Sequence, residues 1–87
     1  MTKRIDLESI PNIDWVKGEI ETRHHAIAIE QAGDNGDSYV LRLRRAPPKH
    51  KDVTLPHEWL EDLRGKYREH RISQINQRLN DAVNSLS

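Results

Sequence analysis

The chain has 87 residues and no cysteine, and its 14 basic residues balance its 14 acidic ones. This length allows one small domain, and the missing cysteines exclude disulfide bridges and thiolate chemistry. Charged residues make up 32% of the sequence and hydrophobic residues 34%, which is enough apolar content for a folded chain but only for a small core. The neutral total argues against a strongly basic nucleic-acid binder.

The charges are divided unevenly along the chain. Residues 1–40 contain eight acidic and four basic residues, a net charge of −4, so the remainder carries +4. The first residues lack the apolar core of a signal peptide, and no apolar run approaches the roughly 18 residues of a membrane span. We therefore expect a cytoplasmic protein without a membrane anchor, organised as a single domain over residues 1–87.

The N-terminal part contains one ambiguous segment. Residues 1–11 mix charged and isolated apolar positions, and are expected to form an arm. In residues 13–21, the spacing of Ile13, Val16 and Ile20 is typical of a helix, whereas the alternation around Trp15 is typical of a strand. Gly18 would weaken a helix by about 1 kcal/mol, which favours the strand.

A β-hairpin is predicted at about 24–45. Ile27 and Ile29 alternate with polar or small residues before a glycine-rich stretch that contains Asn35-Gly36, and Leu41 and Leu43 alternate after it. Together with residues 13–21, this gives an antiparallel sheet of two or three strands over residues 13–45. The expected fold class is α+β, with this sheet followed by a C-terminal amphipathic helix.

Residues 46–53 are interpreted as a Pro-rich basic connection and residues 54–87 as the helical region. Pro56 suits the first turn of a helix that starts near Leu55, and an apolar face there is predicted to cover the hairpin: Trp59, Leu60, Leu63 and Tyr67.

A second apolar stripe is turned by roughly 150° from the first, if each helical residue advances 100°. It consists of Ile72, Ile75, Leu79, Val83 and Leu86. The helix either breaks near residues 68–71 or continues and offers this stripe to another surface. The stripe can pack on its own domain or serve self-association, and we expect the latter, a homodimer, because so small a sheet has little surface for both stripes.

No catalytic or metal site is expected. His24 and His25 would point to opposite faces of a strand, so they cannot readily bind one ion, and no cofactor motif occurs. His57 and His70 adjoin glutamates, but are interpreted as helix-capping or solvated groups. No serine lies in a nucleophile-elbow context, and the sequence predicts a protein that is not an enzyme.

The remaining feature is a basic strip near the end of the hairpin, formed by Arg42, Arg44, Arg45, Lys49 and Lys51. It could be a solvated sheet face, a docking site for an acidic protein surface, or a site that follows phosphates. Our main hypothesis is a small protein-binding module, an accessory regulator or inhibitor that occupies a larger protein partner. The alternative is a sequence-tolerant nucleic-acid-binding protein that uses the strip 42–51.

Overall fold

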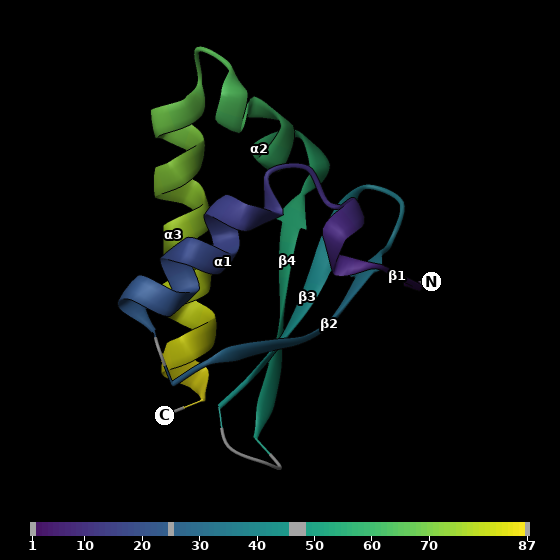
Figure 1. Cartoon of the computed structure of the whole chain (residues 1–87), viewed down its shortest axis with the longest axis vertical. Helices are drawn as coiled ribbons and strands as arrows, with labels where there is room; N and C mark the ends of the chain where they lie inside the picture. Colours follow the sequence, from purple (N-terminus) through teal and green to yellow (C-terminus); the bar gives the residue numbers. More distant parts are fainter. Residues whose placement is uncertain (1, 25, 46–48, 87) are drawn as a thin grey trace.

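The computed structural model describes residues 2–24, 26–45 and 49–86. Four antiparallel strands form one sheet in chain order: β1 (Lys3–Ile5), β2 (Ala28–Asp34), β3 (Ser38–Arg44) and β4 (His50–Pro56). Around the sheet lie the helices α1 (Ile13–Arg23), α2 (His57–Glu61) and α3 (Arg68–Ser85), with short 3-10 helices η1 (Leu7–Ser9) and η2 (Asp62–Arg64) (Figure 1). The predicted α+β class, with a hairpin followed by a C-terminal helix, is confirmed, but the sheet has four strands rather than two or three.

The hairpin is formed by β2 and β3 and contains a β-bulge. Ile29 pairs with Leu43 and Ala32 pairs with Leu41, and the register shifts by one residue between Ile29 and Gln31. Because of this extra residue, Ile29 and Ala32 face the same side of the sheet although they are three positions apart. The bulge therefore keeps the apolar face continuous where simple alternation would have lost it.

Residues 13–21 are helical, so the predicted strand is wrong. Ile13, Val16 and Ile20 are buried on one side of α1, at the three- and four-residue spacing of a helix. Gly18 is exposed, and a β-carbon there would contact nothing within 4 Å. Since burying each large aliphatic side chain contributes about 1.5–3 kcal/mol, three of them outweigh the cost of one glycine.

The segment assigned to a Pro-rich connection and a helix start is largely a strand. β4 pairs with β3 over its whole length, from Arg44↔His50 to Ser38↔Pro56. Val53 and Leu55 alternate into the core, and the helix begins at His57 rather than near Leu55. Pro47 and Pro48, the two prolines of the predicted connection, lie outside the described residues. The arm at residues 1–11 contributes β1, a short edge strand.

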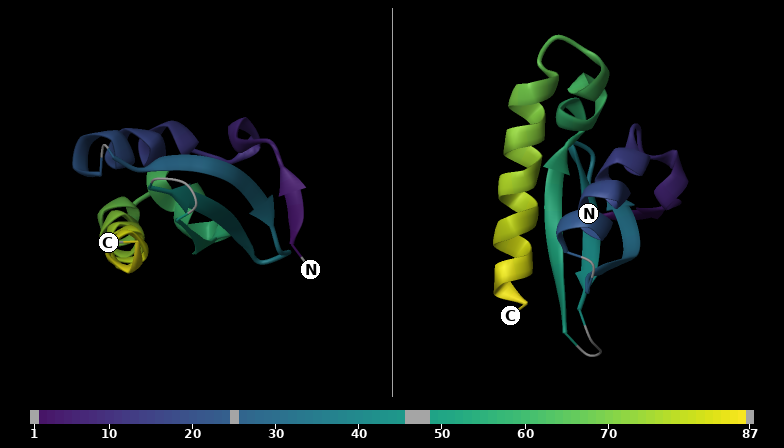
Figure 2. Two further views of the ribbon diagram at one scale, coloured as in Figure 1. Left: turned by 90° about the horizontal axis from the view of Figure 1, so that it is seen from below. Right: turned by 60° about the vertical axis from the view of Figure 1, so that its left-hand side comes forward.

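The core lies between one face of the sheet and the helices. α3 is continuous and runs alongside β4, and Ile75, Leu79 and Leu86 are at most 4% exposed (Figure 2). The helical region is interrupted before α3, at residues 65–67. Tyr67 is exposed rather than packed on the hairpin. The second stripe thus packs on its own domain. The self-association was expected because these side chains would otherwise be exposed, and they are not.

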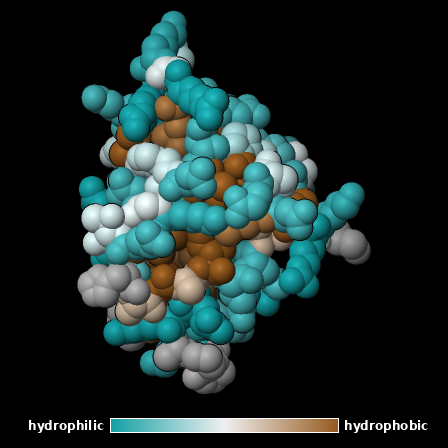
Figure 3. All heavy atoms as spheres, in the orientation of Figure 1, coloured by the Kyte–Doolittle hydropathy of each residue, from teal (hydrophilic) through white to brown (hydrophobic). Residues whose placement is uncertain are grey.

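Ile72 and Val83, the other two members of that stripe, are half-buried and pack against the same core. Trp59, Leu60 and Leu63 are buried as predicted. Apolar side chains reach the surface between α1 and β2 (Figure 3). Within the described ranges, no helix has both the length and the apolar character needed to cross a bilayer.

Candidate functional site on the open face of the sheet

The two faces of the sheet differ in character. Residues paired directly across neighbouring strands project to the same face. The row Ala32, Leu41 and Val53 is buried under the helices. The rows that alternate with it project to the opposite side, which we call the open face, and their described residues include Arg4, Gln31, Val40, Arg42, Arg44, His50, Asp52 and Thr54.

A hollow of about 300 Å³ lies on the open face. Its lining includes Thr2, Arg4, Gln31, Val40, Arg42 and Asp52. Gly33 makes this geometry possible, because a β-carbon there would lie 2.6 Å from Thr2 Cγ2 and 3.1 Å from the Lys3 carbonyl oxygen. The missing side chain therefore lets β1 approach β2 closely, and the N-terminal arm brings Arg4 to the same hollow as Arg42 of β3.

The charges on the open face are only partly neutralised. Arg42 Nε donates to Asp52 Oδ1 at 3.0 Å, across the β3–β4 pair. Neither Arg4 nor Arg44 has an ion-pair partner among the residues that the structure describes, and both are exposed. The face consequently presents the free guanidinium groups of Arg4 and Arg44. Arg42 lies between them and is ion-paired with Asp52.

The structure divides the predicted basic strip. Arg42 and Arg44 share the open face, as expected from their spacing on one strand. Lys51 pairs with Leu43 and is in register with the covered face, so it points away from these arginines. Arg45 and Lys49 lie beyond the strand ends, where Arg45 N donates to the Lys49 carbonyl at 3.3 Å. The five residues do not form one surface.

Sequence reasoning missed Arg4, Gln31 and Val40 as members of the site. Arg4 comes from the opposite end of the chain, and its strand has only three residues. Gln31 and Val40 could have been placed beside Arg42 only with the register of the bulged hairpin. The pattern that could have pointed to Arg4 is the alternation of Lys3, Arg4 and Ile5, which is too short to predict a strand.

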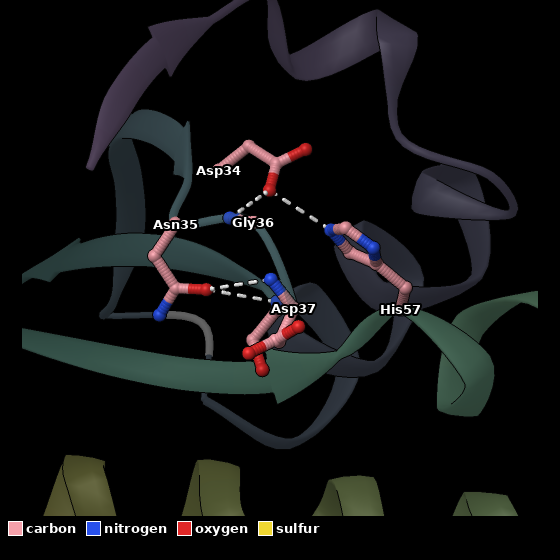
Figure 4. A network of polar contacts seen from close by, with 6 residues as sticks. Asp34, Asn35, Gly36, Asp37 and His57 are labelled. Atoms are coloured by element: carbon pink, nitrogen blue, oxygen red, sulfur yellow. Dashed lines mark hydrogen bonds and ion pairs between the residues drawn. The ribbon is translucent and has the colours of Figure 1, made fainter. Parts of the chain in front are cut away.

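A second polar cluster joins the hairpin turn to the start of α2 (Figure 4). Asp34 Oδ1 accepts a hydrogen bond from Gly36 N at 2.8 Å and lies 2.9 Å from His57 Nε2. The Gly36 amide, followed by His57, holds the pKa of Asp34 below its usual value. His57 is therefore a hydrogen-bonding partner of the turn rather than the predicted helix-capping or solvated group.

The aromatic ring of Tyr39 lies against this imidazole, with ring centroids 4.3 Å apart. Burial raises the pKa of the Tyr39 phenol. His57 N also donates to the Asp37 carbonyl at 3.1 Å, so backbone and side chain bind the same turn. These contacts hold the hairpin turn against the start of α2, which is a structural role.

The other histidines do not gather. His24 Nε2 lies 3.0 Å from Asn80 Oδ1, which connects the end of α1 to α3, and His25 lies outside the described residues. Residues 2–24, 26–45 and 49–86 contain no group of three His, Asp or Glu side chains placed to hold a metal ion.

The open face is thus a surface on which two arginines without an ion-pair partner in the described part of the chain lie near a hollow. No known protein family, curated protein sequence or solved structure matches this chain.

Proposed function

We propose that this protein is a small non-enzymatic binding module whose open face docks on an acidic surface of a larger protein. The observation that supports it is the hollow between Arg4 and Arg42, with Arg44 free beside it. An arginine fork can bind a carboxylate through two parallel hydrogen bonds, so the free guanidinium groups of Arg4, which lines the recess, and of Arg44, on the same face, suit an Asp- or Glu-rich protein surface. Such a module acts by occupying its partner, as an accessory regulator or inhibitor.

The distribution of aromatic rings favours protein over nucleic acid. Single-stranded nucleic acids bind open sheets through aromatic side chains on which bases stack. Tyr39 pairs with Leu55 on the covered face and packs against His57, so its ring is not available to the open face. Among the described open-face residues the only aromatic ring is His50, and Asp52 would repel phosphates.

Self-association through the C-terminal helix does not form part of this proposal. Ile75, Leu79 and Leu86 are buried within the single chain, so they cannot form an interface without unfolding the domain.

The proposal is tested by capture from an extract of the native host, with and without nuclease. The Arg44→Glu variant should lose the partner, because it reverses an exposed charge on the open face. Lys66→Glu is the matched control, since Lys66 is equally exposed but follows η2, away from the sheet. Equal capture by both variants, or capture that nuclease abolishes, would contradict the proposal.

A further inference from the structure

The edge of the sheet next to β1 is left partly unpaired. β1 pairs with β2 only from Lys3↔Asp34 to Ile5↔Ala32, whereas β2 continues back to Ala28. Residues 28–31 therefore have a strand neighbour on the β3 side alone. In the described part of the chain, no hydrogen bond from outside the sheet reaches their backbone. Such an edge offers free N–H and C=O groups for another strand.

An apolar groove runs beside this edge, between α1 and β2, and encloses about 300 Å³ (Figure 3). Leu7, Ile20, Ile27 and Ile29 line it together with Ala28, and Lys17 and Glu21 stand at its rim. Ile20 and Ile27 are nearly buried, while Leu7 and Ile29 are half-buried. A strand placed along the edge would have this groove available for every second side chain.

The surroundings of the groove are negatively charged. Lys17 Nζ is bound to Glu8 Oε1 at 2.8 Å, so its charge is already neutralised. Glu21 and Glu30 are exposed and have no ion-pair partner among residues 2–24, 26–45 and 49–86. The edge therefore combines unpaired backbone, an apolar groove with Glu21 and Lys17 in its lining, and Glu30, a carboxylate with no ion-pair partner among the described residues.

We propose that residues 28–31 accept an extended segment of a partner protein by strand addition, and that this segment alternates apolar residues with lysine or arginine. The apolar residues would enter the groove, and the cations, on the opposite side of the added strand, would meet Glu30. A second copy of the chain is disfavoured as the occupant, because antiparallel pairing of two such edges would bring Glu30 of both copies close together. The proposal uses the backbone edge of β2 and the groove beside α1, whereas the open face is defined by side chains, of which Ala28 and Gln31 also belong to residues 28–31; each proposal has its own test.

The test uses a small panel of synthetic nonapeptides that alternate valine, isoleucine or leucine with lysine. A matched panel carries glutamate in place of lysine, and a third carries N-methyl groups along one backbone edge of the lysine peptides. Titrations of the full chain, followed by NMR, should show that lysine peptides bind at least tenfold more tightly than either control. Hydrogen exchange should slow at the amides of residues 28–31.

Charge reversal on the protein provides a second measurement. Glu30→Lys should weaken binding of the lysine peptides about tenfold, whereas Glu58→Lys, an equal change on α2, should leave it unchanged. The proposal is overturned if no lysine peptide slows exchange at residues 28–31, or if the glutamate or N-methylated peptides bind equally well. It is also overturned if these amides are already protected in a dimer of the protein alone, as light scattering would reveal.

Discussion

Asn12 connects the N-terminal arm to the helical region through one side chain. Its backbone is left-handed, with φ of 58°, a conformation that asparagine tolerates better than most residues. Its Nδ2 donates to the Leu60 carbonyl at 2.6 Å, and its Oδ1 accepts from Arg64 Nε at 2.8 Å. One residue thus sets the direction of the chain into α1 and joins it to α2 and η2.

Replacing Asn12 should separate these two contributions. Asn12→Gly keeps access to positive φ but loses both hydrogen bonds, which should lower the free energy of unfolding by about 1–2 kcal/mol. Asn12→Ala loses the hydrogen bonds and also strains the backbone, for a total of about 2–3 kcal/mol. Urea denaturation followed by tryptophan fluorescence would measure both. Equal losses in the two variants would show that the backbone conformation contributes nothing.

The Asp34 carboxylate should make stability depend on pH in the acidic range. Because Gly36 and His57 hold its pKa below the usual 3.8, the folded state favours the charged form. The resulting stabilisation is fully present above pH 3.8 and is lost as the pH falls through the lower folded-state pKa. The stability advantage of the wild-type protein over Asp34→Asn should therefore shrink in urea titrations from pH 5 to pH 2. An advantage that stays constant over this range would contradict the assignment.

Among the elements, the helix α3 has one face buried against the domain and the opposite face exposed to solvent. Its buried side chains, Ile75, Leu79 and Ala82, recur at four- and three-residue intervals and face β4 and the core. Arg78 lies beside this stripe and donates from Nη1 to the Thr54 carbonyl at 2.7 Å, while its guanidinium carbon lies 4.8 Å from the centroid of the Trp59 ring. Helix and sheet edge are therefore joined by packing and by one arginine.

Ile75→Asp should unfold the domain rather than separate a dimer. An unpaired carboxylate at a fully buried position costs several kcal/mol, comparable with the total stability of so small a domain. Ser73→Asp places the same charge on the exposed side of α3 and should be neutral. Circular dichroism with light scattering over a concentration series distinguishes the cases. A folded Ile75→Asp monomer, derived from a wild-type dimer, would restore the self-association hypothesis.

The sequence was informative where the determinants of an element are local. Alternating residues around Asn35-Gly36 predicted the hairpin, and Gly36 has the expected positive φ of 105°. The strand β4 was not predicted because only Val53 and Leu55 mark its apolar face. Its strand conformation depends on pairing with β3, which the sequence of residues 50–56 does not reveal. The helix α1 was missed because one glycine was weighted above three apolar residues whose burial only tertiary packing provides.

The open face could be predicted only in part for the same reason. Arg42 and Arg44 are two residues apart on one strand, so their common face follows from the sequence. Arg4 joins them through β1, a strand of three residues whose close approach depends on Gly33. Lys51 is close to the arginines in the sequence, but it lies on β4 in register with Leu43 and therefore faces the other side of the sheet.

For the molecule as a whole, the two proposed surfaces carry opposite charge. The open face presents Arg4 and Arg44, whereas the edge at residues 28–31 is bordered by Glu21 and Glu30. In the two proposals, a neutral chain binds an acidic surface with one face and a basic extended segment with one edge. This division explains how zero net charge is compatible with electrostatic recognition at two places.

The salt dependence of binding separates a protein partner from nucleic acid at the open face. If Arg4, Arg42 and Arg44 contacted phosphates, the logarithm of the binding constant would fall with the logarithm of salt concentration by about 0.9 per contact. Replacing one arginine by alanine would then reduce that slope by about one unit. We expect instead that generic DNA and RNA do not bind at physiological ionic strength, because Asp52 opposes phosphates and Tyr39 faces the other side of the sheet.

Fluorescence anisotropy with labelled oligonucleotides measures this directly. Salt-sensitive binding that Arg42→Ala and Arg44→Ala together abolish, while Lys66→Ala does not, would assign the open face to nucleic acid.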